Sequence, residues 1–301
     1  DRVSNLWASF NAVAVANPYA WLRTPMTAEE IRSPSNGNRM VGFPYTRAMN
    51  SNWDLDQAAA LILCSVETAE AMGVSRDRWL FPHAGTDGRD TNYVSNRGDL
   101  HSSPAIRVAG RTAMDLAGVG PDTIDHVDLY SCFPSAVQIG ATELGLCLDR
   151  QLTQTGGLTF AGGPLNNYVT HSIATMANRL REEPGTVGLC SANGGYVTKH
   201  AFGIYSTNPP QAGFRHADCQ EEIDRFPSTA LDGNYVGAGT LEAYTVMHGA
   251  DGPEQALAAI KTPNGRQWAN SRDGELLDAM ITREHVGLAV EVAPDFTFHV
   301  G

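Results

Sequence analysis

Three segments in the second half of the chain decide its fold: VDLYSCF at residues 127–133, GGLTFAGGPLNN at residues 156–167 and CSANGGY at residues 190–196. Each of them contains a polar or glycine-rich turn that follows a short apolar run. In layered α/β proteins, turns of this kind at the ends of strands present reactive groups to a ligand. The sequence therefore predicts an α/β domain whose functional site is built from these three loops.

Apolar patterns around the three loops predict alternating strands and helices. Residues 58–65 (AAALILCS) form a continuous apolar run, which is typical of a strand buried on both faces. Residues 104–116 form an amphipathic pattern that predicts a helix ending at Gly118. Further strands are expected at residues 78–83, 127–130, 187–190 and 200–205, and further helices at residues 5–16, 66–72, 134–144 and 172–181. This alternation predicts a layered α-β-α architecture.

The pattern changes after residues 208–213 (NPPQAG), which resemble a linker. Beyond them the sequence predicts about five short strands and one helical turn, and Pro263-Asn264-Gly265 is a strong hairpin signal. The strands are expected near residues 240–247, 255–261, 266–269, 286–292 and 296–300, with the helical turn near residues 275–281. Five strands with one helix predict a C-terminal all-β domain of the OB type over residues 208–301.

Composition excludes several classes of function. The net charge of −12 argues against general nucleic-acid binding, and no apolar run is long enough to span a membrane. The five cysteines lack paired spacing and the nine histidines are scattered, so we expect neither disulfides nor a metal site, as in a cytoplasmic protein. The chain begins with Asp1 instead of methionine, and we expect it to be a processed product or part of a longer polypeptide.

The order of the motifs resembles that of a known family. VANPY at residues 15–19, EEI at residues 29–31 and DQAAALILCS at residues 56–65, followed by the three loops, resemble the thiolase superfamily. The similarity is greatest to thiolases of the sterol-carrier-protein type and to actinobacterial thiolase-like proteins named acetyl-CoA acetyltransferases. It extends to Ser206, about two thirds of the chain, and the β-rich tail resembles OB-fold modules that accompany some acyl-CoA enzymes.

The resemblance implies a domain organisation and a ligand. Residues 1–100 would be the end of the thiolase N-terminal part with its loop region, and residues 101–207 the C-terminal α/β domain. Coenzyme A or acyl-CoA is the implied substrate or ligand, with no tightly bound cofactor. The N-terminal thiolase half, in the same or a separate chain, is the implied partner, and a homo- or hetero-oligomer is expected.

Thiolase chemistry needs particular side chains. A cysteine thiolate takes the acyl group from coenzyme A and is activated by the histidine of a Gly-His-Pro turn. A second cysteine, followed by glycines, removes the α-proton of the incoming acetyl-CoA as a general base. A loop that carries asparagine or histidine helps to hold the thioester oxygen while negative charge develops on it.

Here the corresponding positions differ from the family pattern. Tyr130 stands at the oxyanion-binding position, and Gly163 replaces the histidine of the Gly-His-Pro turn, where His171 is the nearest imidazole along the chain. Either Cys190 or Ser191 occupies the position of the general base, depending on how the glycines are aligned. The residues expected to approach coenzyme A are Gly162, Gly163, Asn166, Gly194 and Gly195.

Three functions are compatible with this pattern. The first and favoured hypothesis is a thiolase-like protein that binds acyl-CoA and has weak or lost acyltransferase activity, because Gly163 cannot activate a thiol. The second is a retro-aldolase acting on acyl-CoA side chains, with Tyr130 as general acid or base and Tyr196 as a possible second group. The third is a scaffold or partner subunit without enzymatic activity.

Overall fold

The computed structural model describes all residues from 1 to 301 and divides into two compact units. Unit 1 comprises residues 1–29, 49–90 and 101–225, and unit 2 comprises residues 30–48, 91–100 and 226–301. Neither unit is continuous in sequence, so the units differ from the predicted domains, whose boundaries lay at residues 100 and 207.

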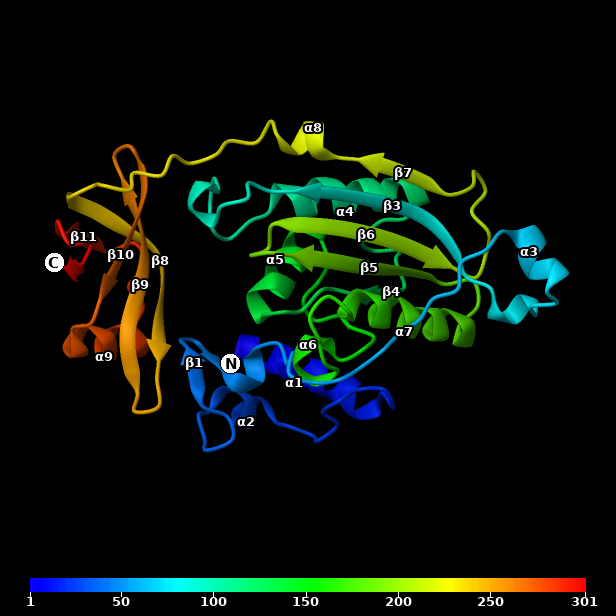
Figure 1. Cartoon of the computed structure of the whole chain (residues 1–301), viewed down its shortest axis with the longest axis horizontal. Helices are drawn as coiled ribbons and strands as arrows, with labels where there is room; N and C mark the ends of the chain where they lie inside the picture. Colours follow the sequence, from blue (N-terminus) through cyan, green and yellow to red (C-terminus); the bar gives the residue numbers. More distant parts are fainter. The chain divides into compact units, whose positions relative to one another are not determined.

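Unit 1 is organised around a mixed five-stranded sheet (Figure 1). Its strands, in spatial order, are β4 (His126–Asp128), β5 (Val187–Gly194), β6 (Lys199–Ser206), β3 (Phe81–Arg89) and β7 (Arg215–Asp218). The outer pairs β4–β5 and β3–β7 are parallel, and the inner pairs are antiparallel. Residues 208–213 therefore do not end the α/β part, because the chain returns to the same sheet as β7.

Helices cover both faces of this sheet, and the predicted α-β-α layering is confirmed (Figure 1). Helices α4 (Pro104–Ala117) and α5 (Pro134–Leu144) lie on one face, and α7 (Tyr168–Glu182) lies on the other. The start of α4 is fixed by Ser103, whose Oγ accepts a hydrogen bond from the Ile106 amide at 3.2 Å. Its end is fixed by Gly118, which adopts the left-handed conformation with φ 72°.

The N-terminal helix α1 (Arg2–Ala16) belongs to unit 1 and packs against the short helix α6 (Gly157–Phe160). Trp7 and Phe10 of α1 are buried and stacked, with ring centroids 5.0 Å apart. The other short helices of the chain are α2 (Ala28–Arg32), η1 (Arg47–Met49), α3 (Val66–Ala71), η2 (Arg76–Arg78), η3 (Val94–Asn96) and α8 (Gln220–Ile223). None of the helices combines the length and apolar character needed to cross a lipid bilayer.

The strand predicted at residues 58–65 is wrong for this chain. These residues form no regular structure, and Ile62 and Leu63 are 96% and 84% exposed. A strand is stable only when its backbone pairs with another strand, and no strand of the protein pairs with this segment. Its apolar composition is therefore not explained by the core of unit 1.

Unit 2 consists mainly of antiparallel strands. They are β1 (Met40–Gly42), β2 (Tyr45–Thr46), β8 (Gly237–His248), β9 (Pro253–Thr262), β10 (Gly265–Ser271), β11 (Ala289–Val292) and β12 (Phe298–Val300), with helix α9 (Gly274–Thr282). The long strand β8 pairs with β9 and also with β11, β11 pairs with β12, and a bridge from Asn270 to Thr297 links β10 to the start of β12. Five strands and one helix in the tail are thus confirmed, whereas the OB topology stays a prediction.

A buried ion pair fastens residues 91–100 to the strands of unit 2. The Arg266 side chain is 1% exposed and contacts Glu242 through two bonds, Nε to Oε2 at 2.6 Å and Nη2 to Oε1 at 2.8 Å. Its Nη1 donates to the carbonyl oxygens of Ser95 and Arg97, both at 2.8 Å. These contacts join segments about 170 residues apart in the sequence. Local sequence patterns therefore could not predict which segments of the chain make up this unit.

Candidate functional site

The first and third loops of the sequence analysis lie side by side, because they follow the neighbouring parallel strands β4 and β5. The Tyr130 amide donates a hydrogen bond to Ser191 Oγ at 2.8 Å. Two residues further along each loop, Asn193 Nδ2 donates a hydrogen bond to Cys132 Sγ at 3.5 Å. The predicted proximity of these two loops is therefore present in the structure.

The second loop reaches the same edge of the sheet through residues 51–52. Ser51 Oγ donates to the carbonyl oxygen of Cys132 at 2.9 Å. The Gly163 amide donates to the carbonyl oxygen of Asn52 at 2.8 Å. All three loops are thus connected at one edge of unit 1 by short hydrogen bonds.

Asp128, at the end of β4, fixes the path of the second loop. It is completely buried, and its Oδ1 accepts a hydrogen bond from the Tyr168 hydroxyl at 2.9 Å. Its Oδ2 accepts bonds from Thr153 Oγ1 at 3.0 Å and from the amides of Gln154 and Thr155 at 2.7 and 3.1 Å. Sequence reasoning missed this residue, although an acidic side chain inside a short apolar run was the available signal.

Tyr130 presents a neutral phenol at this edge. Its ring packs edge-on against Tyr168, with centroids 5.5 Å apart, and its hydroxyl has no hydrogen-bond partner in the protein. Burial raises the pKa of Tyr130, and the neighbouring Cys132 thiol adds to this effect. At neutral pH the side chain is therefore a hydrogen-bond donor and not a phenolate.

A second polar group without a partner belongs to Asn193. Its Oδ1 is buried and makes no hydrogen bond, while Nδ2 contacts Cys132. Asn193 and Tyr130 line the same small cavity of about 20 Å³, together with His200, whose Nε2 lies 3.8 Å from Asp90 Oδ2. A cavity of this size holds about one water molecule. The phenol of Tyr130 and the amide of Asn193 are thus the two polar groups that this edge offers to a bound atom.

The thiols near the loops are unsuited to act as a base or nucleophile. Cys190 is buried on the face of β5 that packs against Met176 and Leu180 of α7, and burial raises its pKa far above the ordinary value. Burial raises the pKa of Cys132 to about 11. Both thiols are therefore protonated at neutral pH, which disfavours Cys190 as a general base, and its catalytic role stays a prediction.

Ser191 and His171 both have partners within the protein. Ser191 lies on the opposite face of β5 from Cys190, because side chains alternate along a strand, and its Oγ accepts the bond from the Tyr130 amide. His171, in the first turn of α7, has its Nε2 2.9 Å from Asn167 Nδ2. Burial lowers the pKa of His171, so that the neutral ring accepts this bond. His171 thus lies at the glycine turn but is held by Asn167.

The Gly162-Gly163 turn has no room for side chains. A Cβ atom at Gly163 would lie 2.8 Å from Leu158 Cδ2 and 2.9 Å from Leu158 Cγ. A Cβ atom at Gly162 would lie 2.7 Å from Gln57 Oε1, and its φ of 106° is one that only glycine adopts without strain. The turn is therefore filled by the protein itself and leaves no room for a side chain at Gly163.

Gly194 and Gly195, the other two glycines predicted to approach coenzyme A, lie in a hairpin turn. Strand β5 ends at Gly194, whose carbonyl oxygen accepts a bond from the Thr198 amide at 3.2 Å, and Gly195 has φ 67° in the turn. Gly195 is exposed, as is Asn166 after the Gly-Gly-Pro turn. Contact of these residues with coenzyme A stays a prediction.

Comparisons with known proteins agree with this geometry. Residues 86–207 match the family described as Thiolase C-terminal domain-like, and residues 218–297 match the Thiolase-like protein type 1 additional C-terminal domain. The crystal structure of a monomeric SCP2-thiolase like protein type 1 from Mycobacterium smegmatis superposes with a TM-score of 0.87 and 34% identity, covering 99% of this chain and 67% of that one. This chain belongs to the thiolase-like proteins.

Sequence relatives carry names from acyl-CoA metabolism. An acetyl-CoA acetyltransferase from Methanocaldococcus jannaschii is 30% identical over 134 residues, which are 44% of this chain and 33% of the relative. The benzoylsuccinyl-CoA thiolase subunit BbsB from Thauera aromatica is 26% identical over 190 residues, which are 57% of this chain and 47% of the relative. The chain thus spans a third to about half of the length of these relatives.

Proposed function

We propose that this thiolase-like chain, of the acetyl-CoA acetyltransferase class, binds acyl-CoA at the edge formed by its three loops and has weak or lost thiolase activity. Support comes from the retained loop order and from the hydrogen bonds that join the first, second and third loops. The names of the relatives from Methanocaldococcus jannaschii and Thauera aromatica point to the same class of ligand.

One observation carries the proposed loss of activity: the turn at Gly163 is packed against Leu158. A thiolase needs an imidazole at that turn to activate its nucleophile. The candidate thiols of the chain are no substitute, because burial raises the pKa of both Cys132 and Cys190. Proton transfer from a thiol at this edge is therefore disfavoured in the chain as it stands.

The retained groups are suited to binding a thioester carbonyl. The Tyr130 hydroxyl has no partner in the protein and can donate one hydrogen bond to a carbonyl oxygen. Nδ2 of Asn193 is engaged with Cys132, and its buried Oδ1, which has no partner, can accept a hydrogen bond from a donor group of the ligand or from a bound water. A neutral phenol that donates to a carbonyl oxygen is the type of contact that stabilises developing negative charge.

The free hydroxyl of Tyr130 also supports the second candidate, a retro-aldolase acting on acyl-CoA side chains. The raised pKa of Tyr130 allows it to act as a general acid and disfavours its action as a general base. Cleavage of a β-hydroxyacyl-CoA to an aldehyde and a shorter acyl-CoA, present in the wild-type chain and abolished in Tyr130→Phe, would favour this candidate over the first.

Acyl-CoA binding is tested by thermal unfolding with and without 1 mM acetyl-CoA. For a Kd of about 0.1 mM, mass action stabilises the folded state by about 1.4 kcal/mol, which corresponds to roughly 3–6 °C in the midpoint of unfolding. We expect the shift in the wild-type chain and a shift reduced by at least half in Tyr130→Phe and Asn193→Ala. Thiolysis of acetoacetyl-CoA is expected to stay at the background rate in all three proteins.

A matched control is Tyr235→Phe, a tyrosine of unit 2 whose hydroxyl donates to a backbone carbonyl of its own turn. The acetyl-CoA shift should be unchanged in this variant. An identical unfolding midpoint for the wild-type chain with and without acetyl-CoA would refute the binding proposal. Rapid thiolysis by the wild-type chain would refute the proposed loss of activity.

A further inference from the structure

A small cavity at the loop edge of unit 1 brings polar residues from three segments together. Its polar lining comes from Tyr130, Ser191, Asn193 and His200, and its apolar lining includes residues of α4 and α5 and Phe202. Asn193 and His200 lie opposite each other on the antiparallel strands β5 and β6, so their side chains project from the same face of the sheet. Ser191, two residues before Asn193, lies on that face as well. The cavity is therefore a polar site between β5, β6 and the first loop.

This cavity has the size and the hydrogen-bonding groups that a single water molecule needs. Its volume of about 20 Å³ exceeds the roughly 10–15 Å³ required for one water. Asn193 Oδ1 is buried without a hydrogen-bond partner and can accept a bond from water. Ser191 Oγ accepts a bond from the Tyr130 amide, and its own hydrogen has no acceptor in the protein. A water molecule between these two groups satisfies both of them, whereas an apolar atom would leave both unsatisfied.

An imidazole in the wall of the same cavity lies next to a buried carboxylate. His200 is 5% exposed, and its Nε2 lies 3.8 Å from Asp90 Oδ2. The Asp90 carboxylate accepts hydrogen bonds from the Ala105 amide at 3.0 Å and from Ser103 Oγ at 2.5 Å. The Asp90 amide donates to the carbonyl oxygen of Thr198 at 2.8 Å, which fixes the carboxylate beside β6. Because a fixed carboxylate stabilises the imidazolium that forms when the ring takes up a proton, this pair is suited to general-base catalysis.

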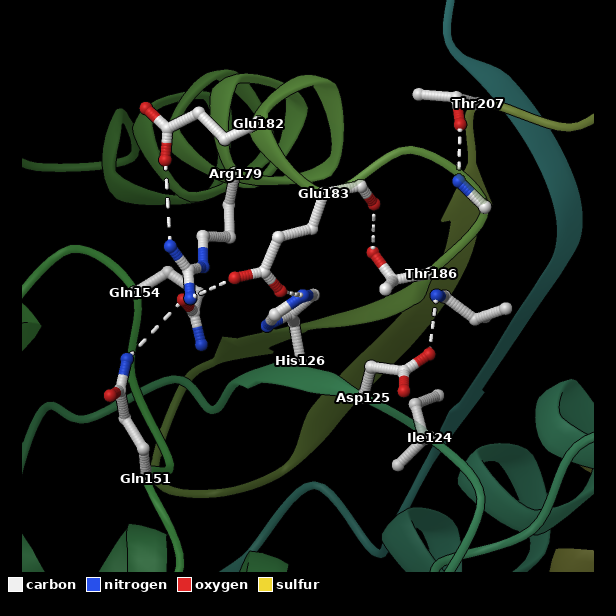
Figure 2. Close-up of polar contacts among 12 residues, drawn as sticks. Ile124, Asp125, His126, Gln151, Gln154, Arg179, Glu182, Glu183, Thr186 and Thr207 are labelled. Carbon is white, nitrogen blue, oxygen red and sulfur yellow. Dashed lines mark hydrogen bonds and ion pairs between the residues drawn. The ribbon is translucent and has the colours of Figure 1, made fainter.

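The other buried histidine of this sheet belongs to a different network. His126, at the start of β4, has its Nε2 3.0 Å from Glu183 Oε2, and Glu183 Oε1 lies 2.6 Å from Arg179 Nη2 (Figure 2). His126 does not line the cavity, and its ion-pair partners come from the last turn of α7 and the residue after it. His200 is therefore the imidazole that shares a cavity with Tyr130 and Asn193.

We propose that the cavity holds the nucleophilic water for hydrolysis of an acyl-CoA thioester, with His200 as its general base and Asp90 as a positioning residue. The inference rests on the proposed function, because the thioester must bind with its carbonyl oxygen at the Tyr130 hydroxyl. The water oxygen forms a bond to the thioester carbon while one of its protons passes to His200 Nε2, and the resulting oxyanion accepts the hydrogen bond from Tyr130. The carbon–sulfur bond then breaks, the coenzyme A thiolate takes the proton from His200, and a carboxylic acid remains. This reaction needs neither an imidazole at Gly163 nor a reactive thiol.

Hydrolysis is tested by chromatography of the coenzyme A released from acetyl-CoA, with no coenzyme A added, so that thiolysis cannot contribute. We expect the wild-type chain to release coenzyme A at least tenfold faster than buffer, without an acetylated form of the chain in mass spectra taken during turnover. His200→Gln should lower kcat at least 100-fold, within the range that a general base contributes, and leave the acetyl-CoA shift in thermal unfolding unchanged. Ser191→Ala removes one of the groups that hold the water and should lower kcat about tenfold, which gives a second test if His200→Gln fails to fold.

The matched control is His216→Gln, which removes an exposed imidazole of the same sheet whose Nε2 lies 2.9 Å from Asp87 Oδ1. Hydrolysis should keep the wild-type rate in this variant. The inference is overturned if the wild-type chain releases coenzyme A no faster than buffer, if folded His200→Gln keeps the wild-type kcat, or if an acetylated chain accumulates. A wild-type chain that shows the acetyl-CoA shift without hydrolysis would overturn this inference and leave the binding proposal intact, whereas the absence of both would overturn both.

Discussion

At the edge of unit 1, two sets of polar side chains differ in how many hydrogen-bond partners they have within the protein. The carboxylate of Asp128 accepts bonds from Tyr168, Thr153, Gln154 and Thr155, all buried in the protein. Two residues after Asp128, the Tyr130 hydroxyl has no partner, and on the neighbouring strand β5 Asn193 Oδ1 is unpaired. The first group holds the loops in position, and the second is available to a ligand.

Under the proposed function, this difference means that the loops keep their shape without side chains that transfer protons. The course of the second loop depends on Asp128 and on the close packing at Gly163, neither of which needs a catalytic side chain. The positions of the loops are therefore fixed by structural contacts and not by the candidate catalytic side chains. Three substitutions test that separation.

The largest effect is expected for Asp128→Ala. The change leaves at least three buried donors without an acceptor, and removing one side of a buried charged network costs about 3–5 kcal/mol of unfolding free energy. Urea denaturation should show this loss, and Asp122→Ala, at an exposed position, should change the unfolding free energy by less than about 0.5 kcal/mol. Equal stability of the two variants would contradict the structural role of Asp128.

An intermediate effect is expected for Gly163→Ala. The added methyl group would meet Leu158 at 2.8–2.9 Å, and overpacking of this kind costs about 1–3 kcal/mol. Gly194→Ala is the control, because its methyl group would meet only the Lys199 side chain at 3.6 Å, an ordinary contact distance. If urea denaturation gives the same free energy of unfolding for both variants, the turn at Gly163 is looser than described.

The smallest effect on stability is expected for Tyr130→Phe. Because the hydroxyl has no partner in the protein, its removal should change the free energy of unfolding by less than about 0.5 kcal/mol. Tyr168→Phe, which removes a hydrogen bond to the Asp128 carboxylate, should cost about 1.5–3 kcal/mol. A comparable loss in both variants would show that the Tyr130 hydroxyl has a structural partner and is not available to a ligand.

Local sequence signals were sufficient for much of unit 1. The helix at residues 104–117 was predicted from its apolar stripe, with Gly118 after its end, because these determinants lie within one short segment. The three loops were also predicted to lie together, and the hydrogen bonds from the Tyr130 amide to Ser191 and from the Leu158 amide to Ser131 join them, whereas their role as one site stays a prediction.

Long-range interactions explain what the sequence did not reveal. Residues 40–42 pair with β8, about 200 positions away, and no local pattern indicates such a partner. Cys190 was interpreted as a catalytic candidate because its motif was recognisable, but its position on the α7 face of β5 became clear only from the packing. Asp128 was missed because a single acidic residue does not show how many donors will surround it.

The uncovered segment at residues 58–65 also affects the handling of the chain. An unpaired apolar stretch without charge or proline is prone to pair with other chains. Most proteins protect such stretches with flanking charges or by burial, and here Ile62 and Leu63 point into solvent. Because these eight residues contribute nothing to the core of unit 1, we expect aggregation of this polypeptide at high concentration to begin there.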